Sequence, residues 1–309
     1  MKPNVISIIS PVYGASTTLK ILVEEIIVSV SSINTNFEIL LVDDNCPQNS
    51  WDIIQDLCKS ENRIKGIKLS KNFGQHYAIS AGLKEATGEW IVVMDCDLQD
   101  NPSEIPNLYK KATEGFDIVL GQRINREDSF VKKTQSKLFY SILSYLTGQE
   151  LDNTIGNYGI YHSKVIGVIN NFEEQNRFFP TMVNWVGFKK TAIEINHSKR
   201  KEGRSSYSLK KLLNLALDII LMSSEKPIRL IIKFGLLISF SSFIFIIYKI
   251  ILYLGGNIKV EGYTSIITSI CFFSGLIISF LGIIGLYVSK IFEGVKKRPV
   301  YIIDKKINF

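Results

Sequence analysis

Two aspartates that follow a run of apolar residues are the part of this sequence best suited to chemistry. The run Trp90–Met94 is mostly apolar and ends at Asp95, with Asp97 two positions further on. Such a run predicts a buried central strand of a parallel sheet, and ligands of these sheets bind beyond the carboxyl ends of the strands. Because side chains alternate along a strand, we expect both carboxylates on one side. Two hard oxygen ligands suit Mg²⁺ or Mn²⁺, and such an ion usually carries a substrate diphosphate.

The same acidic stretch has a simpler interpretation. An Asp-x-Asp motif is short and common, and residues 101–104 (Asn-Pro-Ser-Glu) are typical of a helix start that an acidic loop caps. Asp100 fits that capping role better than metal binding. The sequence by itself leaves both interpretations open.

Apolar runs alternate with amphipathic stretches over the first 120 residues. We expect strands over 5–13, 37–44, 64–69, 90–94 and 116–120, and helices over 17–31, 50–58, 75–86 and 103–113. This alternation predicts an α/β fold with a mostly parallel sheet, to which 157–162 and 188–196 would add later strands. No glycine-rich phosphate loop is present, so a bound diphosphate would depend on a metal ion and on side chains.

Charge and hydropathy are distributed unevenly along the chain. The 309 residues carry a net charge of +7 and are 46% hydrophobic, with the apolar excess after residue 227. No patch of interleaved basic and aromatic residues indicates nucleic-acid binding, so the basic balance favours contact with anionic lipid. The four cysteines form no C-x-x-C pair, which is typical of reduced thiols in a cytosolic domain.

Two apolar runs near the C-terminal end, 228–254 and 264–289, exceed the length of about 20 residues that a membrane crossing needs. They predict a two-helix transmembrane hairpin. Residues 290–309 carry six basic and two acidic side chains, a net charge of +4, so the positive-inside rule places this tail in the cytoplasm. Two crossings would return the N-terminal domain to the same side of the membrane.

The predicted organisation therefore has four parts. Residues 1–208 form a cytosolic catalytic domain, 209–227 an interfacial amphipathic helix, 228–289 the two transmembrane helices, and 290–309 a basic cytosolic tail. A further basic amphipathic stretch, 129–146, suits either a membrane surface or ordinary core packing.

Several motifs together resemble one enzyme family. They are Ser10-Pro11-Val12-Tyr13, Leu41-Val42-Asp43-Asp44, Asn72-Phe73-Gly74, Asp95-Cys96-Asp97-Leu98-Gln99-Asp100, Gly121-Gln122-Arg123 and Gly203-Arg204-Ser205-Ser206-Tyr207. In these motifs the chain resembles family 2 glycosyltransferases of the Rossmann-like GT-A fold. More narrowly it is similar to the polyprenyl-phosphate glycosyltransferases, the group that contains dolichol-phosphate mannose synthase and bacterial undecaprenyl-phosphate glucosyltransferases. The resemblance covers essentially the whole chain.

The resemblance implies a role for each matching residue. The nucleotide pocket would be lined by Pro11, Tyr13, Asp43 and Asp44, and the metal ion and donor diphosphate would be held by Asp95, Asp97 and Gln99. The acceptor phosphate would be met by Arg123, Arg126, Arg204, Ser205 and Tyr207. Asp95, Asp97, Arg123 and Arg204 are thus the candidate catalytic residues, although each arginine could equally be a solvated surface charge.

The chain also departs from the family pattern. Gly14-Ala15 stands where Asn-Glu often follows the first tyrosine, and Asn157 stands where many members carry an aspartate proposed as catalytic base. Either that carboxylate is unnecessary, or a neighbour such as Asp152 replaces it. A phosphate acceptor has a second pKa of about 6 and is already largely ionised at neutral pH, so it needs little help from a base.

We therefore expect an inverting, metal-dependent hexosyltransferase. Its donor would be a UDP- or GDP-linked sugar and its acceptor a polyprenyl (undecaprenyl-type) phosphate. It would be an integral protein of a bacterial-type cytoplasmic membrane, a homo-oligomer with the catalytic domain and both termini in the cytosol. Two alternatives stay open: a catalytically silent, membrane-anchored nucleotide-sugar binder, and a glycosyltransferase that acts on a glycan acceptor.

Overall fold

The computed structural model describes residues 2–33, 36–123, 144–146, 154–175, 177–196, 226–255 and 262–309. The chain divides into two units. The first comprises Met1–Ser141, Gln149–Ser208 and Arg298–Phe309, and the second comprises Ile142–Gly148 and Leu209–Lys297.

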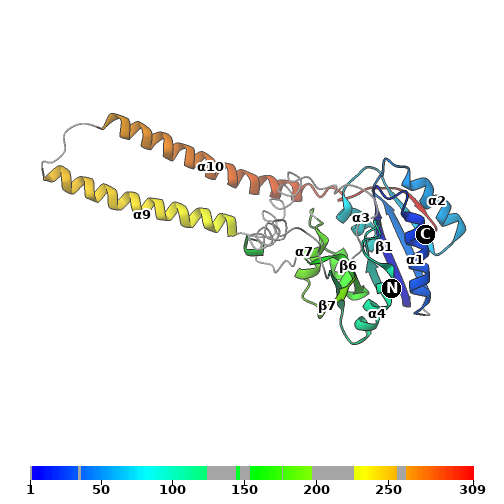
Figure 1. Ribbon diagram of the computed structural model, residues 1–309. Helices are drawn as coiled ribbons and strands as arrows, with labels where there is room; N and C mark the ends of the chain where they lie inside the picture. Colours follow the sequence, from blue (N-terminus) through cyan, green and yellow to red (C-terminus); the bar gives the residue numbers. More distant parts are fainter. Residues whose placement is uncertain are drawn as a thin grey trace. The chain divides into compact units, whose positions relative to one another are not determined.

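The first unit is built on one mixed sheet (Figure 1). Its described strands are β1 (Lys2–Val12), β2 (Asn36–Asp43), β3 (Ile64–Leu69), β4 (Gly88–Val93), β5 (Ile118–Arg123), β6 (Ile155–His162), β7 (Lys190–Ile195) and β8 (Ile303–Ile307). Their order is β7-β5-β6-β4-β1-β2-β3-β8. The four strands at the centre, β4-β1-β2-β3, are parallel, whereas β6 and β8 run antiparallel to their neighbours. The predicted α/β fold with a mostly parallel sheet is confirmed.

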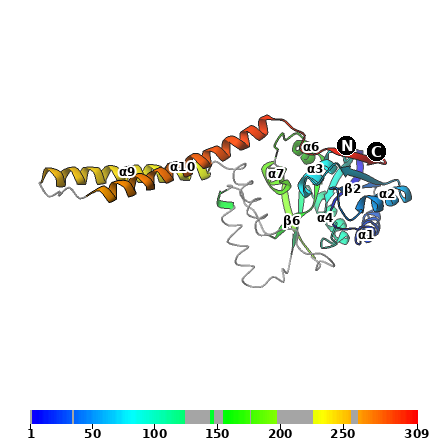
Figure 2. The same cartoon turned by 90° about the horizontal axis from the view of Figure 1, so that it is seen from above.

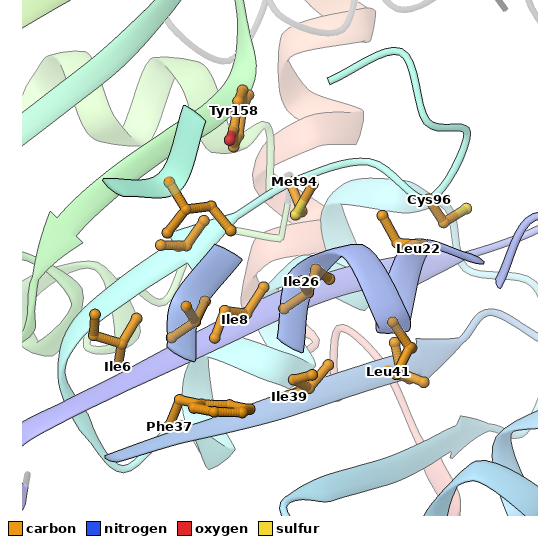
Figure 3. Packing of buried hydrophobic residues seen from close by; sticks show 14 of the residues in the cluster. Ile6, Ile8, Leu22, Ile26, Phe37, Ile39, Leu41, Met94, Cys96 and Tyr158 are labelled. Carbon is orange, nitrogen blue, oxygen red and sulfur yellow. The ribbon is translucent and has the colours of Figure 1, made fainter. Parts of the chain in front are cut away.

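Helices cover both faces of this sheet. One face packs against α1 (Leu19–Ser31), α2 (Ser50–Ser60) and α4 (Ile105–Thr113), which follows the short 3₁₀ helix η1 (Pro102–Glu104); the other packs against α3 (Gln75–Glu85), α6 (Ser163–Asn170) and α7 (Phe179–Trp185). Side chains of β1 alternate between the two faces, as a pleated strand requires. Ile6 and Ile8 join the α1 cluster shown in Figure 3, and Ile9 joins the cluster under α3. Figure 2 shows α6 and α7 beside α3.

Helix α3 lies unusually close to the sheet. A Cβ atom at Gly82 would stand 2.5 Å from Cγ2 of Ile9 and 3.2 Å from Cγ2 of Val42. Only glycine fits this approach, since both neighbours are buried side chains of central strands. The close contact fixes the helix whose first turn reaches the ends of β2 and β4.

The end of the chain supplies an edge strand that the sequence did not reveal. Strand β8 pairs with β3 in an antiparallel register that places Ile307 opposite Gly66 and Lys305 opposite Lys68. The region 290–309 that we expected as a basic tail therefore includes the last turns of a helix and a strand of the sheet. Three charged residues stand between Ile303 and Ile307 in β8. Such charges, lysines above all, are typical of a protected edge strand, because they discourage pairing with a further strand.

The second unit contains two long helices, α9 (Lys226–Leu254) and α10 (Tyr263–Val295). Among the residues that the structure describes, one segment, Phe272–Val295, is long and apolar enough to cross a membrane, with a mean hydropathy of 2.1. The predicted two-helix transmembrane hairpin is therefore corrected to one such helix. The predicted interfacial helix over 209–227, apart from its last two residues, and nearly all of the 129–146 stretch lie outside the described residues.

Candidate functional site

The carboxyl ends of three neighbouring parallel strands meet at one edge of the sheet. Val12 at the end of β1 is in register with Asp43 at the end of β2, and Ile9 is in register with Val93 at the end of β4. Acidic residues follow two of these strand ends, namely Asp44 and Asp95. The fold therefore gathers at one edge of the sheet residues that lie far apart in the sequence.

Asp43 and Asp44, at the end of β2, accept hydrogen bonds from different parts of the chain. Both are buried, and burial raises the pKa of each carboxyl group. Asp44 accepts hydrogen bonds from the backbone N–H groups of Phe73 (2.8 Å) and Gly74 (2.9 Å), so it holds the turn before α3. Asp43 accepts one from the N–H of Cys46 (3.1 Å), while its buried Oδ2 has no hydrogen-bond partner among the described residues. That oxygen is suited to accept a hydrogen bond from a ligand.

Pro11 and Tyr13 are the chain neighbours of Val12, the residue of β1 that is in register with Asp43. Pro11 is paired with Val42 inside the sheet, and the Tyr13 side chain is 48% exposed. Gly14 follows with a φ of 72°, and its N–H donates to Sγ of Cys46 at 3.1 Å. The left-handed backbone explains the glycine at this departure from the family pattern. An exposed aromatic ring is a suitable surface on which a planar base can stack.

Asp95 lies at the centre of an acidic cluster. Burial raises its pKa to about 7, the negative charges of Asp100 and Asp97 add to the rise, and Arg123 and a hydrogen bond from Asn157 oppose it. Its Oδ1 accepts a 2.5 Å hydrogen bond from Nε2 of Gln75. The mutual repulsion of these carboxylates favours a bound cation.

The prediction that side-chain alternation along a strand places Asp95 and Asp97 on one side is wrong. Strand β4 ends at Val93, so the alternation of side chains along a strand does not extend to either aspartate. The loop brings their charges together instead. Within it, Leu98 has a φ of 59°, and Oδ1 of Asp97 accepts a hydrogen bond from the N–H of Gln99 at 3.1 Å. The contact that the structure shows between Gln99 and Asp97 is thus made by the backbone N–H of Gln99.

Arg123 pairs with an aspartate of the same loop. Its Nη2 lies 3.2 Å from Oδ1 and 3.5 Å from Oδ2 of Asp100, whose side chain is fully buried. A Cβ atom at Gly156 would come within 2.7 Å of the same Nη2, so the glycine leaves room for the guanidinium. Asn101, not Asp100, provides the side-chain cap seen at η1, where its Oδ1 accepts from the N–H of Ser103 at 3.0 Å.

The donor set fits a divalent cation in its chemistry. Within the described ranges, no group of three or more histidine, cysteine, aspartate and glutamate side chains is arranged as a metal site. The oxygen ligands of Asp95 and Asp97 are nevertheless those that Mg²⁺ and Mn²⁺ prefer, and their cluster carries an excess of negative charge.

A comparison of the sequence with known families decides the relationship. Residues 7–169, which include the second half of β1, all of β2 to β6 and both acidic strand ends, match the model of glycosyl transferase family 2. The chain belongs to glycosyl transferase family 2.

Relatives of this glycosyltransferase match it over nearly its whole length. It is 34% identical over 300 residues to the uncharacterized glycosyltransferase YkcC of Bacillus subtilis, covering 97% of this chain and 93% of that one. It is 33% identical over 313 residues to the undecaprenyl-phosphate 4-deoxy-4-formamido-L-arabinose transferase of Proteus mirabilis, covering 99% and 95%. The match thus includes the two long helices and the C-terminal strand.

A solved structure shares the fold. The mannosyltransferase PcManGT from Pyrobaculum calidifontis, in complex with GDP-Man and Mn²⁺, superposes with a TM-score of 0.50 at 13% sequence identity, covering 72% of this chain and 64% of that one. The likeness supports the GT-A type of α/β sheet that the glycosyltransferase was expected to have.

The structure brings together part of the predicted site of the glycosyltransferase. Pro11, Tyr13, Asp43, Asp44, Asp95, Asp97, Gln99 and Arg123 lie at or next to the carboxyl ends of the strands. Arg126, Arg204, Ser205, Tyr207 and Asp152 lie outside the described residues. Sequence reasoning missed Gln75, although it marked the break at Asn72-Phe73-Gly74 that precedes it. It also treated Asn157 as a lost carboxylate, whereas the side chain is a neighbour of Asp95.

Proposed function

We propose that this glycosyltransferase moves one sugar from a nucleotide-diphosphate sugar to a polyprenyl phosphate. The observation that carries the proposal is the match over 99% of the chain to an undecaprenyl-phosphate sugar transferase. In the reaction, a phosphate oxygen of the lipid attacks the anomeric carbon with inversion. The bond from that carbon to the diphosphate oxygen breaks, and the nucleoside diphosphate leaves with the electron pair.

The nucleotide would bind at the ends of β1 and β2. The unpartnered buried Oδ2 of Asp43 would accept an N–H of the base, and the exposed ring of Tyr13 would lie against it. Both uracil and guanine present such an N–H group, so UDP- and GDP-linked donors satisfy this site equally. Transfer of a hexose is the corresponding proposal for the sugar.

Asp95 and Asp97 would hold Mg²⁺ or Mn²⁺ together with the donor diphosphate. When bound, the ion would neutralise charge on the departing diphosphate. Gln75 and Asn157 donate hydrogen bonds to Asp95 and so orient its carboxylate. Because the acceptor phosphate is already ionised near neutral pH, the site needs no carboxylate base, and an amide at position 157 is compatible with turnover.

The second unit would anchor the enzyme in the cytoplasmic membrane. Strand β8 is hydrogen-bonded into the same sheet as β1 to β3, and a sheet lies on one side of a membrane. The first unit, which contains both β1 and β8, would therefore stay on one face of the bilayer, and the apolar segment Phe272–Val295 would supply the membrane contact. Lys296, Lys297 and Arg298 directly after α10 favour a cytosolic catalytic unit.

The test uses the full chain purified in detergent. It is incubated with a panel of UDP- and GDP-linked sugars, Mn²⁺ or Mg²⁺, and undecaprenyl phosphate, and lipid-linked sugar is detected by mass spectrometry. We expect one donor to yield a glycolipid, and a chelator to abolish the product. Donor binding without any glycolipid would favour the silent binder, and transfer to an added glycan would favour the glycan-acceptor enzyme; either result would overturn the proposal. The elution volume of the same preparation would test the expected homo-oligomer.

Binding of Mn²⁺ is expected to weaken as the pH falls below about 7, the pKa of Asp95. Protons then compete with the ion for the carboxylate, and the affinity should fall about tenfold per pH unit. The folded-state pKa lies above the ordinary value of 3.8, so the ion-free protein loses the stabilising effect of protonated Asp95 as the pH rises through about 7. The rise in Tm on adding Mn²⁺ should therefore be larger at pH 8 than at pH 6. Equal shifts at both pH values would contradict this expectation.

A further inference from the structure

The last twelve residues are built into the catalytic unit by more than the β8 pairing. The N–H of Ser70, just after β3, donates to the carbonyl of Ile302 at 2.9 Å. Nδ2 of Asn308 donates to the carbonyls of Cys58 and Ile64, both at 2.8 Å. Tyr301 and Ile303 pack against the apolar cluster under α3. The segment Arg298–Phe309, which we name the C-terminal strap, is thus a fixed part of the first unit.

The strap holds α3 at both of its ends. Near the end of the helix, Nζ of Lys306 forms an ion pair with Oε1 of Glu85 at 2.7 Å. Near its start, the Tyr77 hydroxyl donates to the carbonyl of Gln175 at 3.1 Å, and Nε2 of Gln175 donates to the carbonyl of Arg298 at 3.1 Å. Gln175 therefore joins the first turn of α3 to the first residue of the strap.

The loop that carries Gln175 is itself well anchored. Nη1 of Arg177 donates to the carbonyl of Ile169 at 3.2 Å, and Nη2 donates to that of Phe172 at 2.5 Å. Phe178 packs edge-on against His76, with ring centroids 4.6 Å apart. These contacts tie Arg177 to the end of α6 and Phe178 to the first turn of α3.

The first turn of α3 also touches the acidic site. Gln75 donates to Asp95 at 2.5 Å, and Asp44 accepts from the N–H groups of Phe73 and Gly74 immediately before the helix. Gln75 and Tyr77 belong to the same helical turn, so the hydroxyl contact at Tyr77 and the amide contact at Gln75 share one backbone. The strap is thus connected to Asp95 through the hydrogen bonds of Gln175 and Tyr77, the backbone of the first turn of α3, and the hydrogen bond of Gln75.

We propose that Tyr77 and Gln175 are positioning residues, through which the C-terminal strap sets the placement of Gln75 against Asp95 and hence the affinity of the site for a divalent cation. The inference rests on the proposed function for the identity of the ion. Arg298, the first residue of the strap, follows the last residue of α10, Val295, by three positions.

The test measures binding of Mn²⁺ alone to the full chain in detergent, from the EPR signal of the free ion. Tyr77→Phe removes the hydroxyl and Gln175→Ala removes the amide, and each should raise the Kd for Mn²⁺ by about three- to tenfold, the loss of one hydrogen bond's net contribution. The double variant should match the single ones, because the two contacts act in series. Tyr109→Phe is the matched control: this tyrosine of α4 packs against Trp90, and its variant should bind Mn²⁺ as the wild type does.

The readouts separate positioning from a merely structural role. If Tyr77→Phe and Gln175→Ala lower Tm but leave the Kd for Mn²⁺ unchanged, the inference is overturned. It is also overturned if Tyr109→Phe weakens Mn²⁺ binding as much as they do. A wild-type protein that binds no Mn²⁺ would instead contradict the metal-dependent function on which the inference rests.

Discussion

Replacing Asp97 with alanine is expected to lower the rate of sugar transfer by about 10²- to 10³-fold, the usual cost of removing one group that stabilises developing charge. Asp97 raises the pKa of Asp95 by its charge, so the two carboxylates belong to one site. Its Oδ1 also accepts the N–H of Gln99 and so shapes the loop. Without it the proposed cation would retain one fewer carboxylate ligand.

The measurement for Asp97→Ala is the initial rate of glycolipid formation at saturating donor. Asp52→Ala, on the exposed side of α2, removes a carboxylate of the same type and should leave the rate unchanged. Circular dichroism of both variants would verify that the fold is retained. An Asp97→Ala enzyme that keeps more than about a tenth of the wild-type rate would contradict the role given to this side chain.

Replacing Arg123 with leucine is expected to lower the free energy of unfolding by about 3–5 kcal/mol, because it leaves Asp100 buried without its charged partner. The sequence suggested that Arg123 meets the acceptor phosphate. The structure shows its Nη2 hydrogen-bonded to Asp100 and close to Gly156, where a side chain would clash with it. Arg123 can both pair with Asp100 and contact the acceptor phosphate only if one of its N–H groups points to the phosphate while the ion pair is formed.

The double variant Arg123→Leu/Asp100→Leu distinguishes these roles. It replaces a buried ion pair by apolar side chains, which is often neutral for stability, so urea unfolding followed by intrinsic fluorescence should show most of the loss recovered. Glycolipid formation should stay low if Arg123 also contacts the phosphate. Recovery of both stability and activity would assign Arg123 a structural task alone. An unchanged unfolding free energy in Arg123→Leu would show that the pair with Asp100 contributes nothing.

The sequence predicted the parallel core well, since its strands carry apolar residues on both faces. Ile8 and Ile9 enter opposite clusters, and this two-sided burial is what marks a central strand in a sequence. Strand β8 was missed because its five residues include three charges, so it resembles a solvated tail when its partner β3 is unknown. A short edge strand is specified by its neighbour more than by its own composition.

The sequence named the candidate site residues by type but did not predict the contacts among them. Asp95 and Asp97 follow an apolar run and so are visible in the sequence, but the strand ends before them and a loop sets their geometry. The pairing of Arg123 with Asp100 joins residues 23 positions apart, and Gln75 reaches Asp95 across 20. Such contacts depend on strand order, which a single sequence does not specify.

The position of β8 has a consequence for how the protein is made. Ile303–Ile307 are synthesised after the whole of α10. Until then the outer edge of β3 has no partner, and the nascent catalytic unit exposes a row of free backbone groups of the kind that promotes aggregation. The sheet is therefore completed only after both long helices, which separate β8 from the other strands along the chain, have been synthesised.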